Sequence, residues 1–418
     1  MRIMTERTTV CVVGGGPAGM VLGLLLARAG VEVTVLEKHA DFLRDFRGDT
    51  VHASTLTLLD ELGLTEEFAK TPARYVTNVQ VLTDGGPTTI GALNLLPGAH
   101  KHIAFVPQWD FLDMLADAAK QEPSFTLRVS TEVTGPIMEN GRVAGVHYRT
   151  ADGVDGELRA DLTVACDGRY SKVRAAAGLV SRDFGVPMDA WWFRVPRHEG
   201  EPEGATGRFS TGQALVLIDR DDYYQCAYLI RKGEDQRLRA RGVEKFRERV
   251  IELVPFLADR VQEIRSLDDV KLLDVRLDRL PRWYTDGLLC IGDAAHAMSP
   301  VGGVGINLAI QDAVAAARIL APRLRAGRVD TRDLARVQNR RWLPTALTQG
   351  LQRIIHKQFL GKQLTGELNV GGGGKPPLPF RLLRRFPALQ VIPAYVVAIG
   401  FGPEHAPDFA RRPARTKA

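Results

Sequence analysis

The sequence predicts an α/β protein in which a Rossmann-like dinucleotide-binding domain carries an inserted, mostly antiparallel β-sheet domain and C-terminal helices. An apolar run, Thr9–Val13, leads directly into a glycine-rich turn and a helix. Two further buried β runs end at Asp167 and near Gly292, far along the chain. The residues between them mostly alternate between apolar and polar, which is typical of antiparallel strands. We therefore expect one domain assembled from separated segments and a second domain inserted into it.

The opening β-α-β unit has the pattern of a dinucleotide site. Its turn reads Gly14-x-Gly16-x-x-Gly19, its helix stops at Gly30, and its second β run ends on Glu37. Gly14 permits a tight turn, Gly16 lets backbone N–H groups approach a pyrophosphate, and Gly19 lets the helix pack closely on the strand. A carboxylate roughly 20 residues after the turn accepts hydrogen bonds from an adenosine ribose. Strand, helix and acidic strand end together predict dinucleotide binding.

Helices and a β-rich region follow this unit. We expect Ser54 to cap a helix over Thr55–Leu62, and a second helix over Phe111–Lys120 has its apolar residues on one face. Asn140-Gly141 and Asp152-Gly153 predict the turns of a β-meander. The expected strands are Val79–Leu82, Thr88–Leu93, Ile103–Val106, Leu127–Thr134, Val143–Arg149, Glu157–Ala160 and Leu162–Cys166.

The second half of the chain contains the inserted sheet and then returns to the nucleotide-binding domain. Its expected elements are the strands Gly207–Ser210, Ala214–Ile218, Tyr223–Ile230, Val270–Leu277 and Leu288–Ile291 and the helices Val243–Leu253 and Ile306–Leu320. We expect residues 1–75, 108–185 and 278–345 to form the nucleotide-binding domain. Residues 76–107 and 186–277 would form the inserted substrate domain, and residues 346–418 a C-terminal helical segment and tail.

The composition is that of an ordinary soluble protein, with 45% apolar and 25% charged residues among 418. The net charge of +6 is spread without interleaved aromatic residues, so nucleic-acid binding is not expected. Cys11, Cys166, Cys226 and Cys290 lack paired or metal-like spacing, which is typical of reduced core cysteines in a cytoplasmic protein without a metal site. No signal peptide or stable membrane insertion is expected. For the apolar stretch Ala388–Phe401, a core segment is favoured over a membrane-surface anchor.

Two further motifs follow buried strands. The first is VACDGRYSKVR, in which a strand ends at Asp167-Gly168. The second is GLLCIGDAAHAMSPVGGVGINLAIQDA, in which a strand ends at Gly292-Asp293. A proline–glycine loop then leads to a helix N-terminus at Gly305–Asn307. With the opening turn, these motifs resemble, in order and spacing, the single-component FAD-dependent aromatic hydroxylases of the p-hydroxybenzoate hydroxylase type. The resemblance covers roughly residues 8–320. It extends to Arg47 after the second strand and to Gln108 at a helix start.

The resemblance implies a FAD-binding domain of the glutathione-reductase type. Within it, the first glycine turn would hold the FAD pyrophosphate, Glu37 the adenosine ribose, and Asp293 the ribityl chain. Asp167-Gly168 would support FAD and the approach of NAD(P)H, and the loop Pro300–Asn307 would lie along the pyrimidine edge of the isoalloxazine. The cofactor-binding residues implied are Gly14, Gly16, Pro17, Ala18, Gly19, Glu37, Lys38, Arg47, Gln108, Asp167, Asp293, Pro300, Gly303, Gly305, Ile306 and Asn307.

Physical chemistry supports the loop assignment independently of the resemblance. Reduced flavin is an anion at neutral pH, and a helix N-terminus with exposed N–H groups stabilises negative charge. Gly302, Gly303 and Gly305 would let the backbone approach a planar ring without Cβ clashes. His296 lies within the family's GDAAH string, where packing near the flavin is favoured over a direct part in the reaction.

The substrate site is less clearly marked. In the family, one strand region carries an arginine and a serine that bind a substrate carboxylate. The matching region here is Ala214–Ile218, which is apolar, and Arg220 lies at the turn beyond it. Burying an unpaired carboxylate there would be costly, so we expect a larger, less polar aromatic or polycyclic substrate. Residues named for this site are Leu217, Tyr224, Cys226, Tyr228 and Pro300. Tyr224, Cys226 and Tyr228 share one strand face, which lines either the pocket or the core.

Together these observations predict a FAD-dependent, NAD(P)H-consuming monooxygenase. The resemblance implies that it hydroxylates its aromatic substrate with molecular oxygen through a flavin hydroperoxide, as a cytoplasmic monomer or homodimer. No catalytic side chain is identified. The alternatives are a FAD-dependent oxidoreductase that does not insert oxygen, and a non-redox FAD-containing binding or cyclisation protein.

Overall fold

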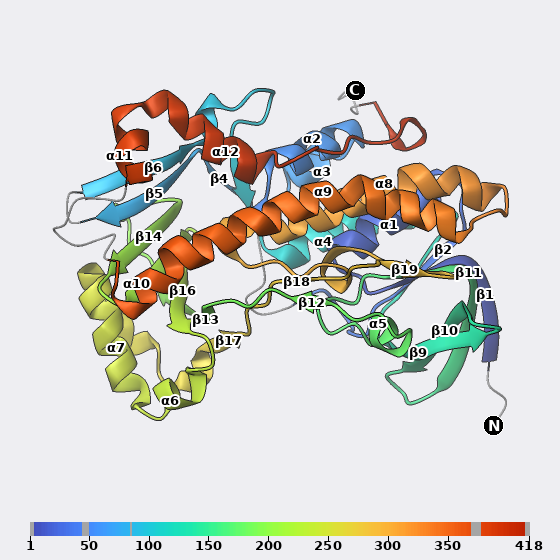
Figure 1. Ribbon diagram of the computed structural model, residues 1–418, viewed down its shortest axis with the longest axis horizontal. Helices are drawn as coiled ribbons and strands as arrows, with labels where there is room; N and C mark the ends of the chain where they lie inside the picture. Colours follow the sequence, from blue (N-terminus) through green and yellow to red (C-terminus); the bar gives the residue numbers. More distant parts are fainter. Residues whose placement is uncertain (1–3, 44–49, 84–85, 369–377, 414–418) are drawn as a thin grey trace.

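The computed structural model describes residues 4–43, 50–83, 86–368 and 378–413, so the predicted FAD contact Arg47 lies outside the described residues. Two β-sheets lie toward opposite ends of the molecule (Figure 1). The long helix α9, Thr331–Ile355, runs from one sheet toward the other and packs along α8, Val304–Arg325. The three sequence motifs lie at the ends of strands of the first sheet and at the start of α8.

The first sheet has eight strands in the order β19-β20-β11-β1-β2-β8, with β10 and β9 added to β11. Strands β1, β2, β8, β11 and β20 run parallel where they pair, and Val12 lies opposite both Val35 and Val164. The carboxyl ends of these strands therefore meet at one edge. The strands are β1 Met4–Val13, β2 Val33–Leu36, β8 Phe125–Arg128, β9 Thr131–Glu139, β10 Arg142–Thr150, β11 Asp155–Ala165, β19 Tyr284–Thr285 and β20 Leu288–Cys290.

Two strand predictions in this sheet need correction. Glu157–Ala160 and Leu162–Cys166 form one continuous strand, β11, because its first half pairs with β10 while its whole length follows β1. The predicted strand Leu127–Thr134 is divided between β8 and β9 at Ser130, whose φ of 52° is incompatible with an extended chain. The turn at Asn140-Gly141, with φ values of 50° and 80°, is as predicted.

The second sheet has seven strands in the order β17-β13-β16-β15-β14-β5-β6 and is mostly antiparallel, except that β14 and β5 run parallel. Segments 78–92 and 188–273 thus share one sheet although the chain between them belongs elsewhere. Small sheets of β3-β7-β4 and β12-β18 complete the strands. The bounds are β5 Asn78–Thr83, β6 Gly86–Ala92, β13 Met188–Pro196, β14 Ala205–Ser210, β15 Gln213–Asp219, β16 Tyr223–Arg231, β17 Lys271–Leu273, β3 Thr50–Val51, β7 Ile103–Phe105, β4 Arg74–Val76, β12 Arg182–Asp183 and β18 Asp278–Arg279.

Most helices lie where the hydrophobic periodicity predicts them, but one predicted cap is wrong. The helix α2 begins at Ala53 with His52 at its N-cap position. Ser54 is inside the helix, and its hydroxyl instead donates to Asn307 Oδ1 at 3.0 Å. Besides α8 and α9, the described α-helices are α1 Pro17–Arg28, α2 Ala53–Glu61, α3 Thr65–Phe68, α4 Gln108–Lys120, α5 Lys172–Ala176, α6 Asp235–Arg239, α7 Gly242–Leu253, α10 Gly361–Thr365, α11 Leu378–Arg385 and α12 Val391–Ala398.

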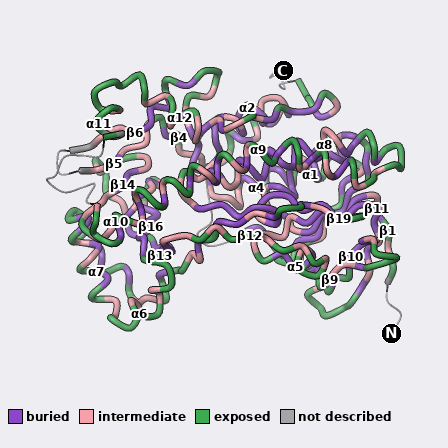
Figure 2. Tube along the Cα trace, viewed as in Figure 1, coloured by how far each residue is buried: buried purple, intermediate pink, exposed green. Residues whose placement is uncertain are grey.

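The burial pattern follows the two sheets (Figure 2). Cys11, Cys226 and Cys290 are buried and Cys166 is partly buried, all as free thiols. The stretch Val301–Arg325 is long and apolar enough to cross a membrane by length and composition, but 78% of its most apolar window is buried inside the protein. Among the described residues, no cluster of three or more His, Cys, Asp or Glu side chains is placed to hold a metal ion.

Candidate functional site

The sequence motifs meet at the carboxyl edge of the eight-stranded sheet. Gly14 N donates to Leu36 O at 2.8 Å, so the first glycine turn lies beside the end of β2 and Glu37. Cys166 N donates to Val13 O at 2.8 Å, which places Asp167 on the other side of the same turn. Because β20 is the next strand, Gly292 and Asp293 follow at this edge. Three motifs that are far apart in the sequence therefore form one site.

The geometry of the first turn explains its glycines. Gly14 has a φ of +102°, and a Cβ atom there would lie 2.6 Å from the carbonyl oxygen of Cys166. A Cβ atom on Gly19 would lie 2.0 Å from Gly14 O, so the helix could not sit as close to the strand. At Gly16, by contrast, nothing described lies within 4 Å of the Cβ position. This open side of the turn is where a phosphate could approach the backbone.

The N-terminus of α1 is suited to an anion. Gly16 is the N-cap, Pro17 and Ala18 begin the helix, and its first turn contains no acidic residue. No side chain among the described residues caps it, so its N–H groups are available to a ligand. Glu37 is held against the turn, because Oε2 accepts from Gly15 N at 2.9 Å and Oε1 from His39 N at 3.1 Å. Lys38 is exposed beside it.

Asp167 is largely buried, and one of its carboxylate oxygens has no partner among the described residues. Its Oδ2 accepts from Lys172 N at 3.0 Å, whereas the buried Oδ1 has no hydrogen-bond partner among the described residues. Burial raises the pKa of Asp167. The following helix α5 is capped by Ser171, and its Arg174 donates to Ala294 O at 3.0 Å. The second motif is therefore joined directly to the third.

Asp293 lies at the end of β20 and is partly accessible, with 33% of its side chain exposed. Arg169 donates to Asp293 Oδ2 at 3.4 Å and to Asp274 O at 3.0 Å. Arg169 thus holds the carboxylate beside Asp167 while leaving room for a hydroxyl-bearing ligand. Gln108, half-buried at the first position of α4, is also exposed enough to contact a ligand.

The second glycine-rich loop leads into a second open helix N-terminus. Gly302 and Gly303 have φ values of 81° and 64°, and Gly303 is the N-cap of α8. The first turn of α8 has no acidic residue and no side-chain cap among the described residues. Thr50 Oγ1 donates to Gly303 O at 2.9 Å and fixes the loop from β3. Pro300, Gly305 and Ile306 are half-buried along this loop.

Asn307 lies one turn into α8 and is buried. Its Oδ1 accepts from Thr55 Oγ1 at 2.6 Å and from Ser54 Oγ at 3.0 Å. The side-chain oxygen of Asn307 therefore joins α8 to α2. This contact explains why Ser54 does not cap its own helix.

The structure also identifies functional residues that sequence reasoning missed, centred on Asp312. This carboxylate is fully buried in α8 and accepts from Gly292 N at 3.1 Å and from Arg341 Nε at 3.0 Å, while His296 Nε2 lies 2.5 Å from it. Burial opposes its ionisation, but His296 and Arg341 hold the pKa of Asp312 below its ordinary value. The sequence did contain a signal for this network, namely an aspartate inside an apolar helix. A buried carboxylate requires polar partners, so partners for Asp312 could have been expected.

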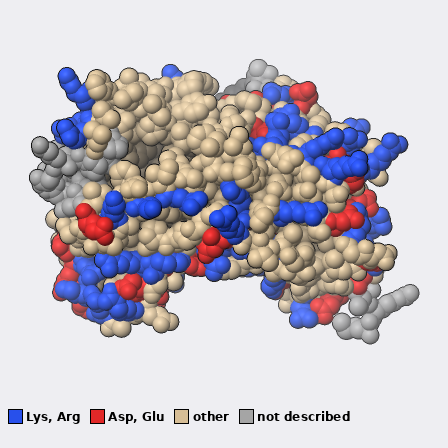
Figure 3. Space-filling view, in the orientation of Figure 1, with Lys and Arg blue, Asp and Glu red and all other residues tan. Residues whose placement is uncertain are grey.

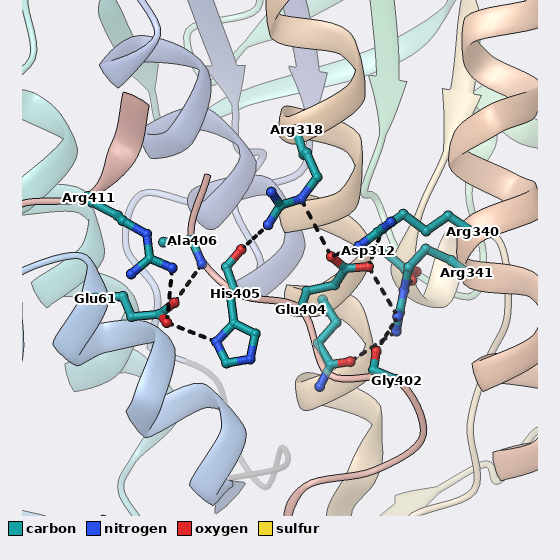
Figure 4. Close-up of polar contacts among 11 residues, drawn as sticks. Glu61, Asp312, Arg318, Arg340, Arg341, Gly402, Glu404, His405, Ala406 and Arg411 are labelled. Atoms are coloured by element: carbon teal, nitrogen blue, oxygen red, sulfur yellow. Dashed lines mark hydrogen bonds and ion pairs between the residues drawn. The ribbon is translucent and has the colours of Figure 1, made fainter. Parts of the chain in front are cut away.

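His296 is buried and bonds to Asp312 behind the Gly292-Asp293 turn. Its ring also lies 4.8 Å from that of Trp283. Figure 4 shows how the network continues into the C-terminal segment. Arg341 donates to Gly402 O at 3.2 Å, and Arg340 binds Glu404 through bonds of 2.6 and 2.9 Å. Farther along, Glu61 accepts from Ala406 N at 2.6 Å.

The seven-stranded sheet has two different faces, and the four strand residues named for the substrate lie on the same one. Leu217, Tyr224, Cys226 and Tyr228 lie in the core beneath α7, with Phe246 and Val250 of that helix. They are buried because strand residues alternate between faces and this face is the covered one. The opposite face packs against Val301 of the glycine loop and carries Trp192, Val216, Ile218, Ala227 and Leu229. Of the residues named for the substrate, Pro300 alone lies in that loop.

Arg220 lies at the edge of this second face, where the two parts of the molecule meet. Its guanidinium is 5.6 Å from the ring centroid of Phe105 in β7 and donates to Gln225 Oε1 at 2.9 and 3.0 Å. Neighbouring Asp221 pairs with Arg74 of β4. These contacts fix the sheet against the strands that adjoin the glycine loop.

The residues at this edge fit FAD. Two open helix N-termini suit a pyrophosphate and an anionic ring, the empty side of Gly16 is a cradle that a Cβ atom would fill, and Asp167 keeps a buried oxygen without a described partner. Strand-end carboxylates at Glu37 and Asp293 match the hydroxyls of a ribose and a ribityl chain. Fold and site together define a FAD-dependent monooxygenase of the flavoprotein type.

Comparison with known proteins agrees with this class. Residues 7–349 match the family model described as a FAD binding domain. The chain is 38% identical over 392 residues to 6-methylpretetramide 4-monooxygenase from Streptomyces rimosus, an alignment that covers 92% of this chain and 91% of that protein. The chain therefore belongs to the FAD-binding family of aromatic monooxygenases.

Solved structures show the same fold. PqsL of Pseudomonas aeruginosa superposes with a TM-score of 0.73 at 20% identity, covering 87% of this chain and 99% of that one. OxyS anhydrotetracycline hydroxylase from Streptomyces rimosus superposes with a TM-score of 0.71 at 23% identity, covering 94% and 76%. The sequence-based assignment to this family is confirmed, with FAD as cofactor and NAD(P)H as the family's usual reductant.

Proposed function

We propose that the chain hydroxylates an apolar, polycyclic phenolic substrate that lies between the glycine loop and the face of the seven-stranded sheet opposite α7. The observation that carries this proposal is the composition of that face. Trp192, Val216, Ile218 and Leu229 are apolar and belong to the cluster that Val301 packs against, so the contact area that this face offers is mainly apolar. The 38% identity to an enzyme whose name specifies a polycyclic substrate supports the same substrate class.

The cofactor roles follow from the site. The first glycine turn, with Gly14, Gly16, Pro17, Ala18 and Gly19, would bind the FAD pyrophosphate. Glu37 and Lys38 would face the adenosine ribose, and Gln108 and Asp293 the pyrophosphate and ribityl chain. Asp167 and its glycine would support FAD where NAD(P)H approaches. The residues Pro300, Gly303, Gly305, Ile306 and Asn307 would follow the pyrimidine edge of the ring.

When bound, FAD supplies the redox and oxygen chemistry, and the chain positions the reactants. The open N-terminus of α8 stabilises negative charge on the reduced ring. The apolar sheet face excludes water from the substrate and sets which ring carbon faces the cofactor. The domain division, the glutathione-reductase-type subdomain arrangement, the cytoplasmic location and a monomeric or homodimeric state remain predictions.

The proposal is tested by NAD(P)H oxidation with FAD-loaded protein and a panel of phenols and polycyclic quinones. Oxygen uptake and peroxide release are followed in parallel, with NADH and NADPH compared. We expect one polycyclic phenol to stimulate NAD(P)H oxidation strongly while little peroxide is released. Simple benzoates serve as the control, because they are too small to fill the apolar face, and stimulation by them alone would contradict the substrate class.

Isotope labelling separates hydroxylation from the alternatives. Product formed under heavy-isotope oxygen should carry one labelled oxygen atom. Unlabelled product would indicate an oxidoreductase that does not insert oxygen. Full turnover without NAD(P)H would indicate a non-redox role for the flavin.

A further inference from the structure

The C-terminal helix α12 has an unusual burial pattern. Between Val391 and Ala398 it carries no charged residue. It buries its small residues Ala394 and Ala398, while the larger Ile392 and Tyr395 are 58% and 40% exposed. A helix that is apolar on all sides is normally covered on all sides. In the part of the chain that the structure describes, nothing covers the outer half of α12.

The exposed apolar surface continues along the chain onto α11. Leu378 and Leu382 are four residues apart on one side of α11, and Phe386 and Leu389 continue the apolar surface from the end of α11 to α12. All four side chains are between 39% and 62% exposed. Both helices pack on β6, the edge strand of the seven-stranded sheet, and lie at the outside of the molecule (Figure 1). Patches of this kind on monomeric proteins mark interaction sites.

The same surface is positively charged. Arg381, Arg384 and Arg385 of α11 are exposed, and residues 378–401 contain no aspartate or glutamate. In Figure 3, Lys and Arg side chains stand at the corner of the molecule where α11 lies, beside a broad area without charge over α11 and α12. We call the exposed residues together the α11–α12 surface; they are Leu378, Arg381, Leu382, Arg384, Arg385, Phe386, Leu389, Ile392 and Tyr395.

We propose that the α11–α12 surface binds reversibly to membranes that contain anionic lipids. A strongly amphipathic helix with arginines beside large apolar residues lies in the interface between lipid headgroups and acyl chains. Each arginine gains attraction from an anionic leaflet, and each apolar side chain gains from burial among acyl chains. For the apolar stretch Ala388–Phe401 the sequence favoured a core segment over a membrane-surface anchor; Ala394 and Ala398 are in the core, and this binding accounts for the exposed Ile392 and Tyr395.

The charge of the α11–α12 surface argues against a second copy of the chain as its binding partner. A symmetric contact through this surface would place Arg381, Arg384 and Arg385 of both copies near each other, with no acidic residue between 378 and 401 to offset them. An acidic protein partner would satisfy the charges, but six protruding apolar residues spread over two helices suit a fluid surface better. Both remain outcomes of the test.

The test uses the full, FAD-loaded chain and does not depend on its reaction. Protein is sedimented with sucrose-loaded vesicles of phosphatidylcholine alone or of phosphatidylcholine mixed with phosphatidylglycerol. We expect the protein to sediment with the mixed vesicles, little with the neutral ones, and less as salt is raised toward about 1 M. Equal sedimentation with both vesicle types, or with neither, would overturn the proposal.

Variants identify the surface. The triple variant Arg381→Gln, Arg384→Gln, Arg385→Gln should weaken binding by about fivefold for each charge removed, and so about a hundredfold in all. The matched control removes three cations from α6 and α7 by Arg237→Gln, Arg241→Gln and Lys245→Gln, with the same change in net charge. We expect this control to bind within a few fold of the wild type. An equal loss in both would show non-specific charge attraction and overturn the assignment.

The apolar half of the surface is tested separately. Leu382→Ser, Phe386→Ser and Ile392→Ser together should abolish sedimentation while leaving the melting temperature and FAD content unchanged, since all three side chains are exposed. The control is Met138→Ser with Val154→Ser, exposed apolar residues at the other end of the molecule. If the wild type fails to bind vesicles and is a dimer that this variant converts to a monomer, a second copy covers the surface instead. Vesicle binding unchanged by the variant would equally overturn the proposal.

Discussion

The nucleotide-binding edge of the eight-stranded sheet and the face of the seven-stranded sheet opposite α7 show two ways of building a site. At the first, backbone atoms approach so closely that the Cβ position of Gly14 lies 2.6 Å from a carbonyl oxygen. At the second, apolar side chains such as Val216 and Ile218 offer contact area without a fixed polar partner. The first arrangement admits one cofactor geometry. The second selects by shape, so it tolerates substitution and permits substrates to vary.

The largest expected effect comes from closing the first turn. Gly14→Val places a β-branched side chain against Cys166 O at a φ of +102°, which valine does not adopt without strain. We expect FAD binding to be lost, measured as quenching of flavin fluorescence on titration.

Gly16→Ala is the matched control for this variant. Nothing described lies within 4 Å of its Cβ position, so the apoprotein should keep its stability while FAD affinity falls by less than in the valine variant. Wild-type FAD affinity in Gly14→Val would contradict the assignment of the turn.

Asp312→Ala should have the next largest effect. It removes the nearer of the two carboxylates that pair with buried Arg341, leaving Glu404 at 3.7 Å, and it removes the acceptor of Gly292 N, which should lower the free energy of unfolding by about 3 kcal/mol. Urea denaturation of the apoprotein measures this loss, and FAD affinity should fall as the Gly292-Asp293 turn loosens. The control Asp312→Asn retains an acceptor and should lose less. Unchanged stability in Asp312→Ala would show that the network does not support the turn.

The sequence indicates which residues gather at the edge of the eight-stranded sheet, but not which face of the seven-stranded sheet is covered by α7, for physical reasons. The glycines, Glu37, Asp167 and Asp293 lie at strand ends, where local spacing fixes their position. For Tyr224, Cys226 and Tyr228, alternation shows that they share a face but not which face is covered. That depended on α7, which packs from elsewhere in the chain. The Asp312 network was likewise hidden, because its partners His296 and Arg341 come from other segments.

A buried histidine, His52, should make the free energy of unfolding depend on pH. His52 is fully buried between the glycine loop and α12, with Nδ1 donating to Val397 O at 2.7 Å, and burial lowers its pKa to about 4. In the unfolded chain His52 takes up a proton below about pH 6.5, whereas in the folded chain it does so only near pH 4. Stability is therefore present above pH 6.5 and is lost as the pH falls toward 4.

This loss amounts to about 2 kcal/mol between about pH 7.5 and pH 5, measured by urea denaturation. His52→Gln removes the titrating group, so its stability should fall less over the same interval. His356, whose pKa burial also lowers to about 4, is present in both proteins and provides the common background. Equal pH dependence in the two proteins would show that His52 does not titrate in this range.

The smallest effect tests the comparison most directly, because it uses two neighbouring residues of β15 that face opposite sides. Val216 is half-buried on the face toward Val301, and Val216→Ala should raise KM for the polycyclic substrate by roughly three- to tenfold at a stability cost below about 1 kcal/mol. Leu217 is buried beneath α7, and Leu217→Ala should cost about 2–5 kcal/mol of unfolding free energy with KM unchanged. Urea denaturation and NAD(P)H oxidation kinetics measure both. The reverse pattern would place the substrate on the α7 side of the sheet.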